Sequence, residues 1–216
     1  MPLWPWHRAR LGRGGVSELV LALGEQRVAD AAAQWADAPT RRARLTLVVA
    51  PGGDVTVDVS QRLSSLDVPN GPTVARVDIT KIPPIPALPA KPADRSWWDA
   101  AHKRATALGA HQAVLVAPDG TLVDGSTAAV WIAERGRLLT LPAPPAILSV
   151  SVAFVRDQAS RADLDIGVEA FTWERFETAD EAFLTNAFGG AAPVRGRGGE
   201  LFERVSALFA EVWRGR

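Results

Sequence analysis

Apolar residues recur at helical spacing near both ends of the chain and at strand spacing between them. Residues 15–38 are rich in Ala and Leu at helical spacing, which predicts one or two helices. Residues 43–50 and 54–59 are β-branched runs on either side of a Pro-Gly-Gly turn, and they predict a hairpin. Residues 74–79 alternate in polarity and predict a third strand. The front of the chain therefore combines helices with a small amount of sheet.

A proline-rich segment at residues 82–92 separates this front part from the rest. Proline fixes φ and biases the preceding residue toward extended conformations, so we expect an extended connector there. We accordingly predict a reduced N-terminal α/β domain at 1–84, a linker at 85–92 that carries Lys91, and a C-terminal domain at 93–216.

The second half alternates short strands with a few helices, in an order that is not regular enough for a doubly wound sheet. The predicted fold class is therefore α+β, with a β-rich C-terminal domain flanked by helices. We expect helices from about residue 96 to Gly109, at 150–163, from Thr172 and at 200–213, and strands or hairpins at 113–125, 128–140, 167–171, 181–185 and 192–194.

Composition excludes several classes of chemistry. Lys and Arg together number 24, as do Asp and Glu, so the chain lacks the basic field of a nucleic-acid-binding protein. There is no cysteine, and the three histidines are not spaced like a metal-ligand set, so we expect no metal site. No run of 18 apolar residues is present and the first residues lack the apolar core of a signal peptide. We expect a soluble cytoplasmic protein with no membrane or nucleic-acid partner.

Several short motifs gain meaning from their order and spacing. They are Lys91 followed after one proline by Ala-Asp-Arg, then residues 109–116, 119–127, 137–142, 147–151 and 179–194 (ADEAFLTNAFGGAAPV), with a shorter His-x-x-Arg-Leu match at 7–11. Together these motifs resemble those of the fold-type IV pyridoxal-phosphate enzymes, the family of class IV aminotransferases and aminodeoxychorismate lyases. The resemblance covers nearly all of residues 88–195, and the 179–194 string is its most specific part.

The resemblance implies that Lys91 is the catalytic lysine, which bonds to the aldehyde of pyridoxal 5'-phosphate and later moves the substrate's α-proton. Such a bond needs a neutral amine, which a nearby cation or loss of hydration can supply by lowering the lysine pKa. The alternative is a solvated linker lysine, the usual fate of a lysine beside prolines. Lys81 and Lys103 lack comparable motifs around them.

Asp124 falls where the family usually carries a glutamate. A carboxylate at that place pairs with the cofactor's ring nitrogen and keeps the ring an electron sink. Aspartate keeps the charge but is one methylene shorter. The alternative is an ordinary turn aspartate before Gly125.

Two further segments match the family's phosphate-binding turns. Ser149, Val150 and Ser151 align with Gly-Ile/Val-Thr, where backbone N–H groups and a hydroxyl hold the phosphate at a helix N-terminus. The alternative for them is a plain helix cap. Thr185 and Asn186 match a second such turn, with a strand end as the alternative.

Arg10 matches the arginine with which the family pairs the phosphate, and its alternative is a surface arginine. The chain starts closer to this motif than family members do, and it has no tyrosine to line a substrate pocket. The resemblance implies a homodimer that acts on a small amino substrate. We expect a lyase like aminodeoxychorismate lyase, which releases 4-aminobenzoate and pyruvate for folate synthesis. The alternatives are a class IV aminotransferase for branched-chain or D-amino acids, and a non-catalytic relative that keeps the fold.

Overall fold

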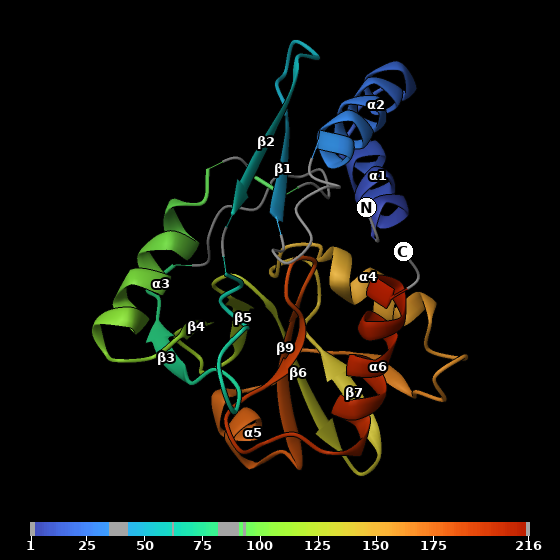
Figure 1. The fold of residues 1–216 in the computed structure, drawn as a ribbon. Helices are drawn as coiled ribbons and strands as arrows, with labels where there is room; N and C mark the ends of the chain where they lie inside the picture. Colours follow the sequence, from blue (N-terminus) through green and yellow to red (C-terminus); the bar gives the residue numbers. More distant parts are fainter. Residues whose placement is uncertain (1–2, 35–42, 62, 82–90, 93, 215–216) are drawn as a thin grey trace.

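The computed structural model describes residues 3–34, 43–61, 63–81, 91–92 and 94–214. They form an α+β fold, as the sequence predicts (Figure 1). In chain order the elements are α1 (Trp4–Arg13), α2 (Glu18–Gln34), β1 (Ala43–Val49), β2 (Val55–Gln61), β3 (Val74–Asp78), α3 (Ser96–Ala107), β4 (Gln112–Val116), β5 (Leu122–Gly125), β6 (Ala129–Glu134), β7 (Arg137–Thr140), α4 (Val150–Asp157), β8 (Ile166–Val168), α5 (Trp173–Thr178), β9 (Glu181–Asn186), β10 (Gly190–Pro193) and α6 (Glu200–Arg214).

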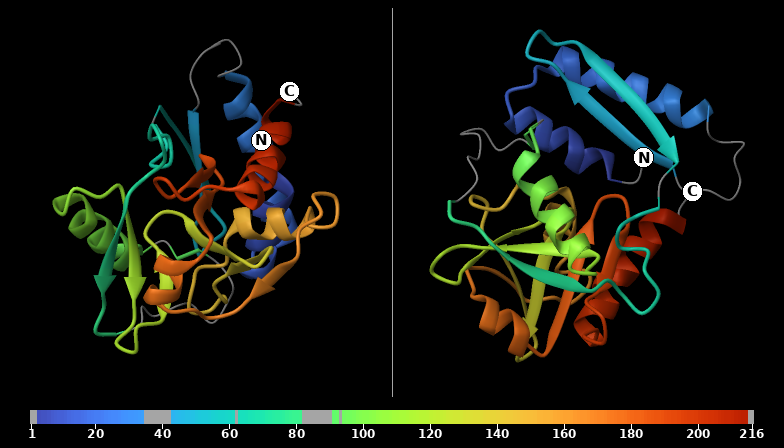
Figure 2. Two further views of the ribbon diagram at one scale, coloured as in Figure 1. Left: turned by 90° about the horizontal axis from the view of Figure 1, so that it is seen from below. Right: turned by 90° about the vertical axis from the view of Figure 1, so that its left-hand side faces the viewer.

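The N-terminal part consists of α1, α2 and the β1–β2 hairpin; α2 and the hairpin extend away from the rest of the molecule, whereas α1 packs against α4 (Figures 1 and 2). The hairpin is antiparallel, with Leu47 opposite Val57. Gly24 in α2 faces both neighbours, because a Cβ built there would lie 3.6 Å from Leu47 and 3.9 Å from Trp4 of α1, which are ordinary contact distances. The hairpin and the first helix therefore pack against the same side of α2.

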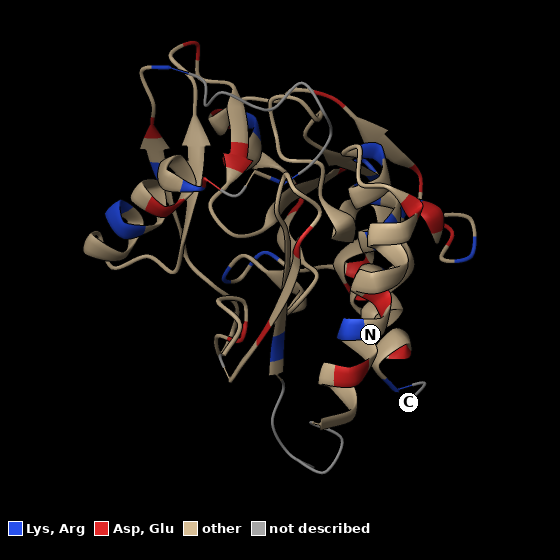
Figure 3. Cartoon of the chain, turned by 90° about the horizontal axis from the view of Figure 1, so that it is seen from above, with Lys and Arg blue, Asp and Glu red and all other residues tan. Residues whose placement is uncertain are grey.

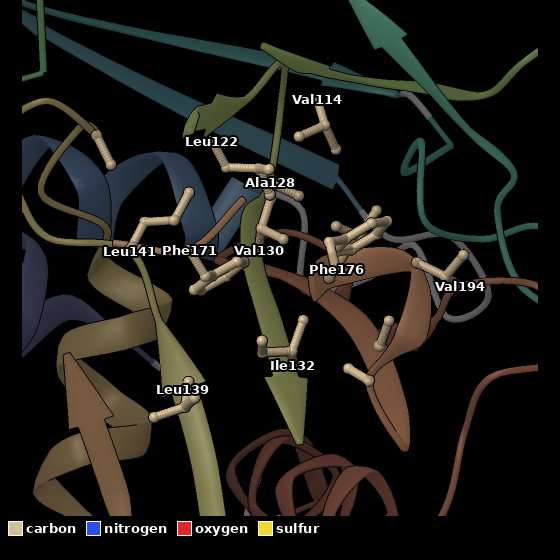
Figure 4. Packing of buried hydrophobic residues seen from close by; sticks show 14 of the residues in the cluster. Val114, Leu122, Ala128, Val130, Ile132, Leu139, Leu141, Phe171, Phe176 and Val194 are labelled. Atoms are coloured by element: carbon tan, nitrogen blue, oxygen red, sulfur yellow. The ribbon is translucent and has the colours of Figure 1, made fainter. Parts of the chain in front are cut away.

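The larger part contains two sheets, one of five strands in the order β10-β9-β6-β7-β8 and one of three in the order β3-β4-β5. Successive side chains of a strand face opposite ways, and the apolar residues of β6 follow this rule. Val130 and Ile132 join the core shown in Figure 4, whereas Trp131 and Ala133 join the cluster formed with α4 and α6. The five-stranded sheet is thus buried on both faces, which explains its nearly continuous apolar runs.

Strand β4 is buried in the same two-sided way. Val114 and Val116 contribute to the core of Figure 4, and Ala113 and Leu115 pack with Trp98 of α3. All five residues of β4 are buried, so α3 covers the outer face of the three-stranded sheet.

Strand β3 pairs in parallel with β4, placing Val74 opposite Gln112. The predicted N-terminal domain of residues 1–84 includes β3, so this pairing crosses the predicted domain boundary. Most of the predicted linker at 85–92 lies outside the described residues, and the structure describes only Lys91 and Pro92 of it. The division of the chain into domains remains a prediction.

Most predicted elements are present, with a few differences. The sequence pattern does not predict helix α1, and α4 ends at Asp157 rather than at residue 163. In Figure 3, basic and acidic residues are interspersed over the view rather than separated by sign. Among the described residues, no helix combines the length and the apolar character that crossing a membrane requires.

Candidate active site

Lys91 lies at the start of the chain segment that leads into α3. Its side chain is exposed to solvent, yet protein surrounds it closely enough that loss of hydration lowers its pKa to about 8. The positive charges of Arg95, Arg10 and Arg44 lower the pKa further, and Asp124 opposes them. An amine with this pKa is partly neutral near pH 8, which is the state that attacks an aldehyde.

Asp124 lies at the end of β5, and only 6% of it is exposed. One carboxylate oxygen, Oδ2, accepts hydrogen bonds from Trp98 Nε1 at 3.0 Å and from the Ile147 N–H at 3.1 Å. The other, Oδ1, accepts the Gly125 N–H at 2.8 Å. Burial raises the pKa of Asp124 to about 6, while these donors and the charge of Arg95 hold it down. The carboxylate is therefore fixed in place and retains one acceptor position on Oδ1.

The start of α3 and the residue before it supply two site residues that the sequence analysis did not identify. Arg95 comes just before the helix, and its Nη2 donates to the Ser126 carbonyl at 2.7 Å while its guanidinium lies 5.5 Å from the ring centre of Trp98. Trp98 is fully buried and reaches Asp124 from the same helix. Arg95 is the last residue of the Lys91 motif, so its position four residues after Lys91 is the feature of the sequence that could have identified it as a site residue.

Helix α1 contributes Arg10 and His7. Nη1 of Arg10 donates to the Leu148 carbonyl at 3.4 Å, which joins α1 to the segment before α4. Burial, followed by the charge of Arg13, lowers the pKa of Arg10 to about 10. Burial, Arg10 and Lys91 lower the pKa of His7 to about 4, so this imidazole is neutral at physiological pH.

A chain of hydroxyl groups runs from the sheet to the start of α4. Ser149 caps the helix, its Oγ lies 2.8 Å from that of Ser151, and Ser151 Oγ lies 2.9 Å from Thr185 Oγ1. Ser151 and Thr185 are completely buried, and Val150 is buried in the cluster beneath α4. The first N–H groups of a helix have no partner within it, so those of Val150 and Ser151 are placed to receive an anion.

Asn186 follows Thr185 at the end of β9, but its side chain is occupied. Oδ1 accepts the N–H groups of Phe188 at 3.0 Å and Gly189 at 2.6 Å, and Nδ2 donates to the Thr127 carbonyl at 3.4 Å. These bonds close the turn between β9 and β10. A contact of this side chain with a cofactor remains a prediction.

One short segment connects the two ends of the site. Ile147 donates to Asp124, Leu148 accepts from Arg10, and Ser149 begins the hydroxyl chain. The donor set therefore combines a lysine of low pKa, a buried carboxylate, several arginines and a helix N-terminus. It fits a ligand that carries an aldehyde, a ring nitrogen and a phosphate, which is the chemistry of pyridoxal 5'-phosphate.

The sequence matches the model of one protein family, the class IV aminotransferases (Amino-transferase class IV), over residues 1–196. The chain belongs to the class IV aminotransferase family. Among curated proteins, no sequence matches it closely enough to count as a relative.

Solved structures share the fold. A hypothetical aminotransferase from Mycobacterium tuberculosis, in its apo form, is 20% identical with a TM-score of 0.78, and the match covers 96% of this chain and 82% of that one. A branched-chain aminotransferase from Thermoproteus uzoniensis, solved with norvaline, is 20% identical with a TM-score of 0.65, and the match covers 74% of this chain and 57% of that one. A protein from Legionella pneumophila, named as a putative 4-amino-4-deoxychorismate lyase, is 16% identical with a TM-score of 0.64. The match covers 74% of this chain and 63% of that one.

These likenesses establish the family fold. The chain spans 57% of the Thermoproteus enzyme and 45% of another branched-chain aminotransferase, solved with N-(5'-phosphopyridoxyl)-L-glutamate. It therefore matches only part of the length of these relatives.

Proposed function

We propose that this chain is a pyridoxal-phosphate-dependent enzyme acting on a small amino substrate. The observation that carries the proposal is the convergence of charges on Lys91. Arg95, Arg10 and Arg44 all lower the pKa of Lys91, and the buried carboxylate of Asp124 lies within electrostatic reach of the same amine. Three cations and a fixed carboxylate around one amine support a catalytic lysine over a linker lysine without charged neighbours.

Each residue has a role in this proposal. Bound pyridoxal phosphate supplies a ring that stabilises negative charge at the substrate's α-carbon. Asp124 offers its remaining acceptor position to the ring nitrogen, and Ser149 with Arg10 holds the phosphate. Lys91 receives and returns the substrate's α-proton through its Nζ, which its low pKa permits near neutral pH.

Between activities, we propose a lyase that releases pyruvate and 4-aminobenzoate from aminodeoxychorismate. The Lys91-Pro-Ala-Asp-Arg context supports this choice, as does the shared fold with the Legionella lyase. Transamination is the second candidate, favoured by the extent of the match to the Mycobacterium aminotransferase. We further propose a homodimer, which sedimentation equilibrium of the full chain would test.

The cofactor proposal is tested by absorbance. Wild-type protein mixed with pyridoxal phosphate should develop a near-ultraviolet or visible band from the adduct with Lys91, and Lys91→Ala should abolish it. Lys103→Ala is the matched control, because Lys103 lies on α3 and should leave the band unchanged. A wild type that binds no cofactor, or a band that survives Lys91→Ala, would refute the proposal.

The choice of activity is tested by two assays on the same preparation. Pyruvate release from aminodeoxychorismate is expected, with little amino-group transfer to 2-oxoglutarate. Transfer without pyruvate release would instead establish the aminotransferase.

A further inference from the structure

Trp131 lies behind the candidate phosphate site, on the face of β6 that is turned toward α4 and α6. Its ring is fully buried and stacks on Phe183 with centroids 5.9 Å apart and an interplanar angle of 8°. Its Nε1 donates a 2.9 Å hydrogen bond to Thr185 Oγ1 on the neighbouring strand β9. The indole thus stands at the buried end of the hydroxyl chain that leads to Ser149.

The chemistry of the groups fixes the direction of this chain. An indole N–H can only donate, so Thr185 Oγ1 accepts from Trp131. Thr185 is completely buried, so its hydroxyl proton needs an acceptor within the protein. Among the described residues, the hydroxyl has one other hydrogen-bond partner, Ser151 Oγ, so Thr185 donates to Ser151. Ser151 in turn must donate to Ser149 Oγ. The opposite direction would leave the buried Thr185 hydroxyl proton without an acceptor.

The chain of hydroxyl groups therefore ends at the candidate phosphate site in a hydrogen-bond donor, the hydroxyl of Ser149. Ser149 Oγ accepts from Ser151 and from the Val152 N–H at 3.4 Å, which uses both of its acceptor positions. Its own proton remains to be donated outward. Ser149 is partly buried and adjoins Leu148, whose carbonyl holds Arg10.

We propose that Trp131 and Thr185 are positioning residues that orient the Ser149 hydroxyl as a hydrogen-bond donor to the cofactor's phosphate. In this proposal both residues act through Ser151, the buried serine of α4, and for Thr185 this indirect role replaces the direct phosphate contact that the family motif predicts. The inference rests on the proposed function for the identity of the ligand. It goes beyond that function because it assigns a role to the buried indole of Trp131 and makes the buried Thr185 a link to Ser149.

The test separates phosphate recognition from general damage. Trp131→Phe removes the N–H and keeps an aromatic ring against Phe183. Its affinity for pyridoxal phosphate should fall about three- to tenfold, as expected for a weakened hydrogen bond, while its affinity for pyridoxal, which lacks the phosphate, stays within about twofold. Thr185→Val should behave alike. Trp173→Phe is the matched control, because it removes an indole N–H from α5 on the other side of the sheet.

A double variant tests the route. Ser149→Ala should lose more phosphate-dependent affinity than Trp131→Phe, and Trp131→Phe should add no further loss in the Ser149→Ala background. Equal losses for pyridoxal and pyridoxal phosphate in Trp131→Phe, or full additivity with Ser149→Ala, would overturn the proposal.

Inorganic phosphate distinguishes failure of this inference from failure of the proposed function. If wild-type protein forms no adduct with either aldehyde, the proposed function fails. Even in that case, inorganic phosphate should raise the melting temperature of the wild type and of Trp173→Phe more than that of Trp131→Phe. Equal rises in all three proteins would refute the positioning role.

Discussion

The indole N–H of Trp98 donates a 3.0 Å hydrogen bond to Oδ2 of Asp124, which ties the only fully buried tryptophan of α3 to the carboxylate at the end of β5. Burial alone would favour the protonated acid, and this donor favours the anion. The pair therefore keeps a carboxylate ionised where water is excluded. Asp124 must carry that charge to pair with a protonated ring nitrogen.

Trp98→Phe should raise the pKa of Asp124 above about 6, because it removes a donor to the ionised form. The folded-state pKa already exceeds the ordinary value of 3.8, so the folded state binds more protons than the unfolded state between these pH values. The contribution of Asp124 to the free energy of unfolding therefore decreases as pH rises from about 4 to 6, and in Trp98→Phe this decrease is larger. The expected loss is about 1.5–3 kcal/mol at pH 8 and less at pH 4.

Urea unfolding at the two pH values measures this difference. Trp97→Phe is the matched control, since Trp97 packs at the edge of the same cluster and shares the same helix. A loss of stability in Trp98→Phe that does not change with pH would show that packing, rather than the bond to Asp124, is responsible.

Arg95 makes the largest charge contribution to the low pKa of Lys91. Replacing it with Met should raise that pKa, because a cation near an ammonium group disfavours the charged form. The rate at which pyridoxal phosphate reacts with the protein should then reach half its maximum at a pH above about 8. Arg95→Lys retains the charge and should keep the wild-type midpoint. Identical midpoints in the Met and Lys variants would contradict this account of the lysine.

Local signals in the sequence are sufficient for much of the fold. The sequence predicts that Gly109 ends α3, and this glycine adopts φ of +78° directly after the helix. The carboxylate of Asp94 accepts the Ser96 N–H at 2.9 Å in the turn before α3, whereas the N-cap position itself is Arg95, which makes no side-chain cap hydrogen bond. The predicted hairpin at 43–59 is also present, because its turn and its β-branched runs are adjacent in sequence. Each of these features depends on neighbouring residues.

The remainder depends on contacts between distant segments. No pattern near β3 indicates that it pairs with β4 across α3, because parallel pairing leaves no turn in the sequence. The bonds of Trp98 and Trp131 could not be predicted, since the sequence does not show which buried indole finds an acceptor. Arg44 carries no signal of its own, because its charge reaches Lys91 only through the folded arrangement of the hairpin and the site.

Gly125 should resist substitution because of its surroundings. A Cβ at this position would lie 2.1 Å from the Ala128 carbonyl oxygen, closer than real contacts allow. Gly125→Ala should lower the free energy of unfolding by about 1–3 kcal/mol and should displace the N–H that binds Asp124. Gly52→Ala, where nothing lies within 4 Å, is the control for denaturant unfolding. Equal free energies of unfolding for Gly125→Ala and Gly52→Ala would mean that the connection between β5 and β6 can shift to accommodate the added methyl group.

Asn186 presents a choice between a role in the fold and a role in binding. Its amide closes the β9–β10 turn through the N–H groups of Phe188 and Gly189 and through the Thr127 carbonyl. Asn186→Ala should therefore lower the free energy of unfolding by about 1–3 kcal/mol, since these groups lose their partners. Its affinity for pyridoxal phosphate, measured below the unfolding temperature, should fall less than that of Ser149→Ala. A larger fall in Asn186→Ala, with stability unchanged, would place this side chain on the ligand instead of in the turn.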